Sequence, residues 1–66
     1  MIEGVVESFD EQHGDGWFVT DAGERLYFHC VTIKDGSRTI PAGVRAVGRR
    51  SVGRLGRDEV FDVSAL

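Results

Sequence analysis

Nine glycines spread over 66 residues restrict what this chain can fold into more than any other feature of its sequence. A glycine inside a helix costs about 1 kcal/mol relative to alanine. No stretch of the chain shows apolar residues recurring with the 3.6-residue period of an amphipathic helix. Short segments rich in β-branched and aromatic residues lie between the glycines and the polar turns. The chain is therefore predicted to be all-β.

Five short strands are expected. In Leu26 to His29, aliphatic or aromatic bulk alternates with polar-tipped rings, as in a half-buried strand. A loop is expected over Lys34–Thr39 and a hairpin turn over Gly53–Gly56. Closure removes the exposed edges of an open sheet, so a five-stranded antiparallel barrel is favoured. The expected strands are Ile2–Phe9, Gly16–Thr20, Arg25–Ile33, Val44–Val52 and Glu59–Ser64.

The length and composition predict one small soluble domain, residues 1–66. A domain of this size buries only about 60% of the surface that its unfolded chain exposes, so binding on an outer face is expected rather than catalysis in an enclosed cleft. The chain has no run of about 18 apolar residues and no signal-like start. Cys30 is its single cysteine, which excludes an internal disulfide. We expect a cytoplasmic protein that does not insert into membranes, is not an enzyme and uses no cofactor.

The net charge of −3 is the sum of two halves of opposite sign. Residues 1–33 contain one base against seven acids, whereas residues 34–66 contain seven bases against four acids. A block of arginines without an acid makes a local positive field, although an edge strand protected by charge against aggregation has the same pattern. The block runs from Gly36 to Arg57 and contains Arg38, Arg45, Arg49, Arg50, Arg54 and Arg57.

Three segments resemble conserved motifs of bacterial cold-shock proteins. Gly14–Val19 is similar to the first ribonucleoprotein motif, Lys-Gly-Phe-Gly-Phe-Ile, and Leu26–Cys30 is similar to the second, Val-Phe-Val-His-Phe. The opening Gly4–Asp10 resembles Gly-x-Val-Lys-Trp-Phe-Asn, and the spacing among the three segments fits without a gap. The resemblance covers the whole chain, and it is strong up to Ile33 and looser afterwards. It implies a five-stranded OB-fold barrel that binds single-stranded RNA or DNA across strands one to three.

A binder of single strands needs exposed flat rings on neighbouring strands and cations at the margin. The two-residue period of a strand places Trp17, Tyr27 and His29 on one outer face. The residues expected to point inward are Phe18, Leu26 and Phe28. The expected nucleic-acid-binding residues are Phe9, His13, Trp17, Tyr27, His29, Arg38, Arg45, Arg49 and Arg57.

Four stacking rings of the family are missing from this chain. Ser8 replaces the family's tryptophan in strand one, and Asp15 and Cys30 replace phenylalanines of the two motifs. A loop aromatic that many family members carry aligns near Arg38. If each stack contributes about 1–3 kcal/mol, four lost rings remove roughly 4–12 kcal/mol. We therefore expect weak to moderate binding.

Charges on the binding face also differ from the family. Glu7 and His13 stand where the family carries lysines. The larger ring of Trp17 and the planes of arginines offset these losses, because arginine stacks on bases and pairs with phosphates. If several of the six arginines border Trp17 and Tyr27, a site displaced toward strand four is expected. If they lie on the far side, an acidic face suited to a basic protein is expected.

Functions other than nucleic-acid binding are also compatible with this sequence. A cold-shock scaffold that has lost most of its nucleic-acid binding can serve as a protein-interaction module, as a monomer or a weak homodimer. The family assignment also implies RNA chaperoning or modulation of transcription. A metal site is disfavoured because His29 and Cys30 are adjacent and project from opposite sides of a regular strand. The side chains weighed for that metal site are His13, Asp15, His29 and Cys30.

Overall fold

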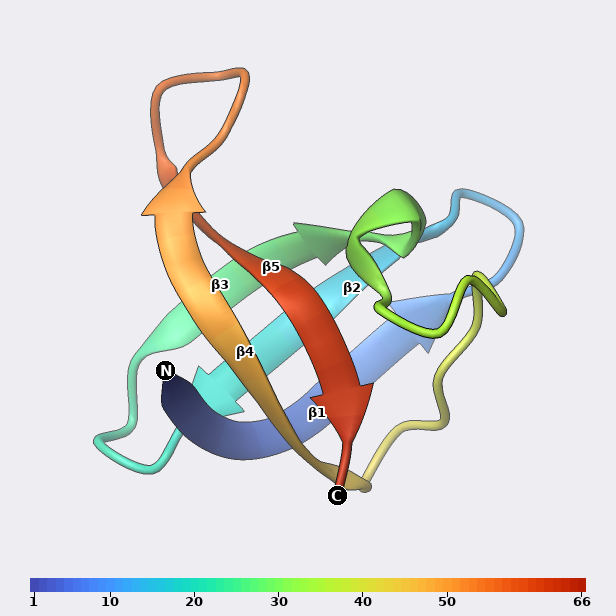
Figure 1. The fold of residues 1–66 in the computed structure, drawn as a ribbon, viewed down its shortest axis with the longest axis horizontal. Coiled ribbons are helices and arrows are strands. Elements are labelled where there is room, and N and C mark those ends of the chain that lie inside the picture. The colour runs from blue at the N-terminus through green and yellow to red at the C-terminus, as the bar shows by residue number, and fades with distance from the viewer.

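The extended segments between the turns pair with one another and close into a ring. In the computed structural model, which describes all of residues 1–66, five strands form a closed barrel in the order β1-β2-β3-β5-β4 (Figure 1). The chain is therefore all-β, as predicted, with a single 3-10 turn, η1. No helix in it has the length and apolar character that crossing a membrane requires. The elements are β1 Ile2–Asp10, β2 Asp15–Thr20, β3 Arg25–His29, η1 Cys30–Thr32, β4 Arg45–Val52 and β5 Asp58–Ala65.

The strand directions correct one prediction. Four of the five pairings are antiparallel, but β3 and β5 pair in parallel, with Tyr27 opposite Glu59. The expectation of a fully antiparallel barrel was wrong for a topological reason. Directions cannot alternate all the way round a closed ring that has an odd number of strands, so at least one neighbouring pair must run parallel.

The third strand is shorter than predicted. It ends at His29 and not at Ile33, and η1 follows it directly. The Nδ1 atom of His29 accepts a hydrogen bond from the backbone N–H of Val31, and the Thr32 hydroxyl donates to the His29 carbonyl at 2.7 Å. These local side-chain bonds turn the backbone away from the sheet. The other four strands begin and end within one residue of their predicted limits.

Side chains alternate between the core and the outside, as the sequence indicates for β2 and β3. Phe18 and Phe28 are fully buried and Leu26 nearly so, which confirms their predicted inward direction. In β1 the alternation shifts at a bulge, because Val6 pairs with Phe18 but Ser8 pairs with Trp17. The buried apolar core consists of Val6, Phe18, Leu26, Phe28, Ile33, Ile40, Ala46, Val60 and Val63.

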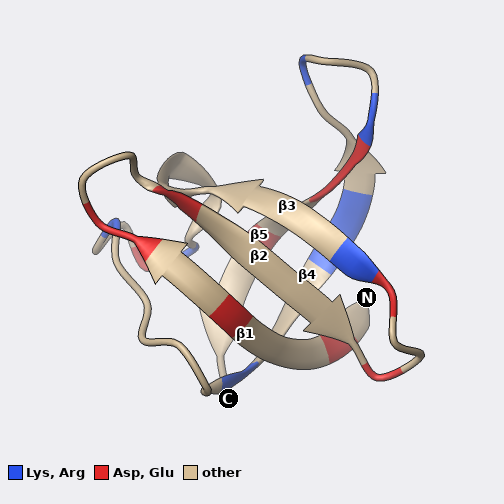
Figure 2. Ribbon diagram, turned by 180° about the vertical axis from the view of Figure 1, so that it is seen from behind, with Lys and Arg blue, Asp and Glu red and all other residues tan.

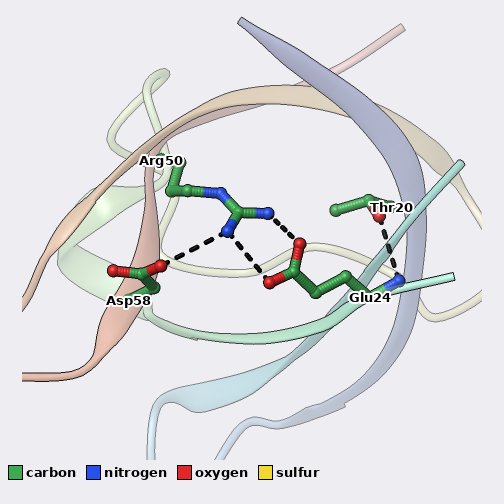
Figure 3. Close-up of polar contacts among 4 residues, drawn as sticks. All are labelled: Thr20, Glu24, Arg50 and Asp58. Carbon is green, nitrogen blue, oxygen red and sulfur yellow. Dashed lines mark hydrogen bonds and ion pairs between the residues drawn. The ribbon is translucent and has the colours of Figure 1, made fainter. Parts of the chain in front are cut away.

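Polar contacts connect the β2–β3 turn to β4 and β5. Arg50 of β4 donates to both carboxylate oxygens of Glu24, and its Nη1 lies 3.3 Å from an oxygen of Asp58 at the start of β5 (Figure 3). The Glu24 N–H in turn donates to the Thr20 hydroxyl at 3.1 Å. Arg50 therefore has a structural role, because it links the β2–β3 turn to the start of β5.

The turn between β4 and β5 projects from the barrel as an extended loop (Figure 1). The predicted hairpin turn is present there, closed by a 3.0 Å hydrogen bond from the Gly56 N–H to the Gly53 carbonyl. Gly53 leaves room for the Glu59 carboxylate, which would have to move if a Cβ were present at this position. The loop thereby places Arg54, Leu55 and Arg57 beside the outer side of β3.

Candidate nucleic-acid interface

Two aromatic rings lie side by side on the outer face of β2 and β3. Trp17 and Tyr27 are direct partners in the strand register, and their rings meet edge to face with centroids 5.7 Å apart. Both side chains are partly exposed, because the inward positions of these strands are already filled by Phe18 and Phe28. The pair forms an aromatic platform of the kind on which unpaired bases stack.

An arginine covers each of the two rings. The guanidinium carbon of Arg25 lies 4.3 Å from the centre of the Trp17 ring, and that of Arg57 lies 4.4 Å from the centre of the Tyr27 ring. Arg25 also donates from Nε to Glu7 at 2.6 Å, and Arg57 Nε lies 3.6 Å from Glu59. The side chains of Arg25, Glu7 and Arg57 are at the surface, whereas Glu59 is buried. Exposed guanidiniums of this kind can exchange a ring or a carboxylate for a phosphate.

Acidic side chains border the rings on the side away from Arg25. Asp10, Asp15 and His29 are aligned across β1, β2 and β3, one outward row beyond Ser8, Trp17 and Tyr27. Figure 2 shows this face, with acidic segments on β1 and β2 and one basic segment at the start of β3. The Trp17 and Tyr27 rings therefore lie between Arg25 and a row of two carboxylates and a histidine.

A hydrogen bond links the two rows. The Tyr27 hydroxyl donates to Asp15 Oδ2 at 2.9 Å. Partial burial of the phenol, and next the bond to the nearby carboxylate, raise the pKa of Tyr27 above its ordinary value. Tyr27 thus stays protonated at neutral pH and keeps the proton that it donates to Asp15.

The two histidines have local structural partners. His13 lies in the β1–β2 turn, and its Nδ1 is 2.9 Å from Asp10 Oδ2. Backbone N–H groups of His13 and Gln12 donate to the other oxygen of Asp10, and the bond from His13 chiefly holds the pKa of that carboxyl below its ordinary range. His29 accepts from the Val31 N–H at the start of η1. Both rings remain exposed at the acidic end of the platform.

Phe9 is placed differently from the other predicted stacking residues. The bulge in β1 turns it toward the barrel interior, where it stacks on Phe28 with ring centroids 5.9 Å apart. It is only partly buried and lines the edge of a hollow beside Trp17. Phe9 thus packs against the core beside the platform, and only part of its side chain is open to a ligand.

The arginines of the second half of the chain are divided among different sides of the barrel. Arg57 borders Tyr27, and Arg54 lines the same hollow as Tyr27. Arg45 pairs with Asp21 at 3.0 Å, with Glu3 also close, and Arg49 pairs with Asp62 at 3.0 Å. Arg38 lies in the β3–β4 loop with a φ of 63°, and Arg50 joins the carboxylates described above. Neither of the two arrangements considered from the sequence is realised in full.

Two hollows flank the platform. One, of about 440 Å³, lies between β3 and the β4–β5 turn, and its apolar wall includes Val31 and Leu55, which are 63% and 77% exposed. The other, of about 550 Å³, lies between the ends of β1 and β2. Its lining residues are Ser8, Phe9, Asp10, Glu11, Asp15, Gly16 and Trp17.

Sequence reasoning missed three residues at this surface, namely Arg25, Val31 and Leu55. Arg25 was identifiable, because it lies two positions before Tyr27 and so shares its outward face. Val31 and Leu55 come together only through η1 and the projecting turn, and no pattern in the sequence places them. The start of η1 at Cys30 also brings its Sγ within 3.7 Å of His29 Nδ1, but no group of three His, Cys, Asp or Glu side chains suits a metal ion.

Comparison with known proteins adds no family to this description. No protein-family profile matches the sequence, and no curated protein matches it significantly.

Proposed function

We propose that the barrel is an OB-fold of the cold-shock type and that it binds single-stranded RNA or DNA on the face of β1, β2 and β3. The observation that carries the proposal is the pairing of Trp17 with Tyr27, each ring outward and each covered by an arginine. OB-folds bind oligonucleotides with the face of strands two and three and with the β1–β2 and β4–β5 loops. The position of Arg57 beside Tyr27 agrees with that geometry.

The affinity follows from the number of rings. Two stacks supply about 2–6 kcal/mol, and contacts from two or three arginines to phosphates add to this. Binding between about 1 mM and 1 µM is therefore expected, because Glu7, Asp10, Glu11 and Asp15 repel the backbone nearby. The proposed protein is a non-enzymatic binder of the cytoplasm that acts on RNA structure or on transcription.

Quenching of Trp17 fluorescence by short oligonucleotides tests the proposal. A single-stranded hexamer of RNA or DNA quenches the indole on stacking, whereas a duplex of the same sequence keeps its bases out of reach. Two or three neutralised phosphates give a slope of log K against log salt of about −1.4 to −2.1. Absence of quenching by both RNA and DNA at low salt would refute the proposal.

A second function is favoured by one observation, the apolar wall of the hollow beside the β4–β5 turn. Val31 and Leu55 are both well exposed there, next to Arg54 and Arg57. Exposed apolar side chains that share a hollow are a feature of protein-interaction surfaces. Sedimentation of the wild type against Leu55→Ser separates the two functions. Self-association that is lost in L55S, without oligonucleotide binding, would favour the interaction module.

A further inference from the structure

Asp15 occupies a position beside the platform that a purely sequence-tolerant binder would not need. It projects from the same face of β2 as Trp17, two residues away, and its Oδ2 accepts the Tyr27 hydroxyl at 2.9 Å. That bond holds the carboxylate at the edge of the two rings. A base stacked on this platform would therefore bring its own edge toward Asp15.

The space beside Asp15 is open. Asp15 and Trp17 line the same hollow, and two of its other lining residues, Ser8 and Gly16, are small. Gly16 has no side chain to fill this hollow, and a Cβ there would point inward, against the Ser8 carbonyl and 3.1 Å from the core ring of Phe28. The hollow has a volume of about 550 Å³, which leaves room for a base edge beside Asp15.

The charges around the rings orient a bound strand. Arg25 and Arg57 cover the rings, whereas Asp10, Glu11 and Asp15 lie at the hollow. A sugar-phosphate backbone is attracted to the arginines and repelled by the carboxylates. The base edges are then directed toward the hollow and toward Asp15.

We infer that Asp15 is a specificity-determining residue, which favours guanine, and after it cytosine and adenine, over uracil and thymine. This inference rests on the proposed function. An ionised carboxylate only accepts hydrogen bonds. Guanine presents the adjacent donors N1–H and N2–H₂, and cytosine and adenine each present an amino group. Uracil and thymine present one N–H between two carbonyl oxygens, which a carboxylate repels.

Three heptanucleotides test the preference on the wild-type protein. They are a thymine heptamer, the same heptamer with one central guanine, and that heptamer with inosine in place of guanine. Inosine lacks only the 2-amino group. By quenching of Trp17, guanine is expected to strengthen binding about five- to tenfold over thymine, the lower part of the range for two-point base contacts. Inosine is expected to lose most of this gain.

Two variants separate base recognition from general repulsion. Asp15→Asn keeps a carbonyl that accepts from Tyr27 but adds an N–H donor. The ratio of the affinity for the guanine-containing heptamer to that for the thymine heptamer is therefore expected to fall toward one, because binding of the thymine heptamer becomes stronger. Glu11→Gln removes the same charge from the lining of the same hollow. It is expected to strengthen all three oligonucleotides alike and to leave their ratio unchanged. Circular dichroism verifies that both variants fold.

The outcomes distinguish base selection by Asp15 from the proposed binding of single-stranded nucleic acid. Equal binding of the three heptamers, tighter binding of the thymine heptamer, or a guanine preference that survives in D15N would overturn the role of Asp15 and leave nucleic-acid binding intact. No quenching by any heptamer at low salt would refute both. The inosine comparison needs no mutation, so it decides the question even if D15N does not fold.

Discussion

The guanidinium of Arg25 lies 4.3 Å from the centre of the Trp17 ring while its Nε donates to Glu7 at 2.6 Å. Arg25 thus occupies the ring face that a base would use and neutralises an acid on the neighbouring strand. In the free protein it covers the platform. On binding, it must give up the ring and can then meet a phosphate, so the strength of its bond to Glu7 affects the affinity for nucleic acid.

Removing the acid is expected to strengthen binding. In Glu7→Gln, Arg25 loses its charged partner and the phosphates lose a repulsive neighbour, so affinity for an oligonucleotide rises by about two- to fivefold, as is usual for an exposed ion pair. The measurement is quenching of Trp17 at low salt. Glu3→Gln makes the same charge change on the same strand, where the carboxylate lies near Arg45 instead. An equal gain in E3Q would mean that net charge, and not Arg25, accounts for the effect.

Neighbouring residues of β2 are expected to separate binding from stability. Trp17→Ala removes a partly exposed stacking ring, so affinity falls by about 5- to 150-fold while the fold persists. Phe18→Leu leaves a gap in the core where Phe18 is fully buried. It lowers the free energy of unfolding by about 1–2 kcal/mol with little effect on affinity. Anisotropy of a labelled oligonucleotide and thermal unfolding measure the two effects. Reduced stability with normal binding in W17A would contradict the assigned platform.

The ion pairs of Arg50 predict a dependence of stability on acid pH. The hydrogen bond from Arg50 holds the pKa of Glu24 below its ordinary value of 4.5. A carboxyl with a lowered folded-state pKa contributes stability above its unfolded-state pKa, and this contribution is lost as the pH falls through the folded-state value. At pH 7 the Tm of Glu24→Gln is expected to lie about 1–5 °C below that of the wild type. The two Tm curves should converge below pH 4.5.

Glu11→Gln provides the control for this pH profile. The Glu11 carboxylate contacts the hydroxyl of Thr39 and no cation. The Tm of Glu11→Gln is therefore expected to equal that of the wild type at each pH. A constant difference in Tm between E24Q and the wild type from pH 7 to pH 2 would show that the lower stability of E24Q comes from packing and not from the charge on Glu24.

The two-residue period predicted much of the barrel. It placed Phe18 and Phe28 inside and Trp17 and Tyr27 outside, because a strand paired on both sides has no freedom to rotate. The bulge between Val6 and Ser8 was not predictable in this way. It depends on the register with β2 and shifts every later side chain of β1, which is why Phe9 lies nearer the core than its assigned role required.

The positions of the charges were the least predictable part of the candidate site. Arg45, Arg49 and Arg50 form one basic stretch in the sequence, yet each meets an acid that lies at least eight residues away in the chain. Those partners come together only when β4 wraps between β1 and β5. Arg25, which is close to the motif residues in the sequence, is the arginine that lies over the Trp17 ring.

The contrast between Arg57 and Arg49 supplies the sharpest test of where nucleic acid binds. Both are exposed arginines near an aromatic ring, with Arg57 over Tyr27 and Arg49 over Phe61 at 5.5 Å. Arg57→Ala removes a cation beside the platform, so affinity is expected to fall several-fold. The slope of log K against log salt should become less steep by about 0.7, the value for one lost phosphate contact on a single strand.

Arg49→Ala removes the same charge on the side of β4 that faces β5, where Arg49 pairs with Asp62. The Asp62 carboxylate already pairs with this charge, and Arg49 lines neither hollow beside the platform, so R49A is expected to bind like the wild type. Anisotropy titrations of both variants at several salt concentrations make the comparison. Equal losses in R49A and R57A would point to a diffuse electrostatic attraction. A loss confined to R49A would move the binding surface to β4 and β5, away from Trp17 and Tyr27.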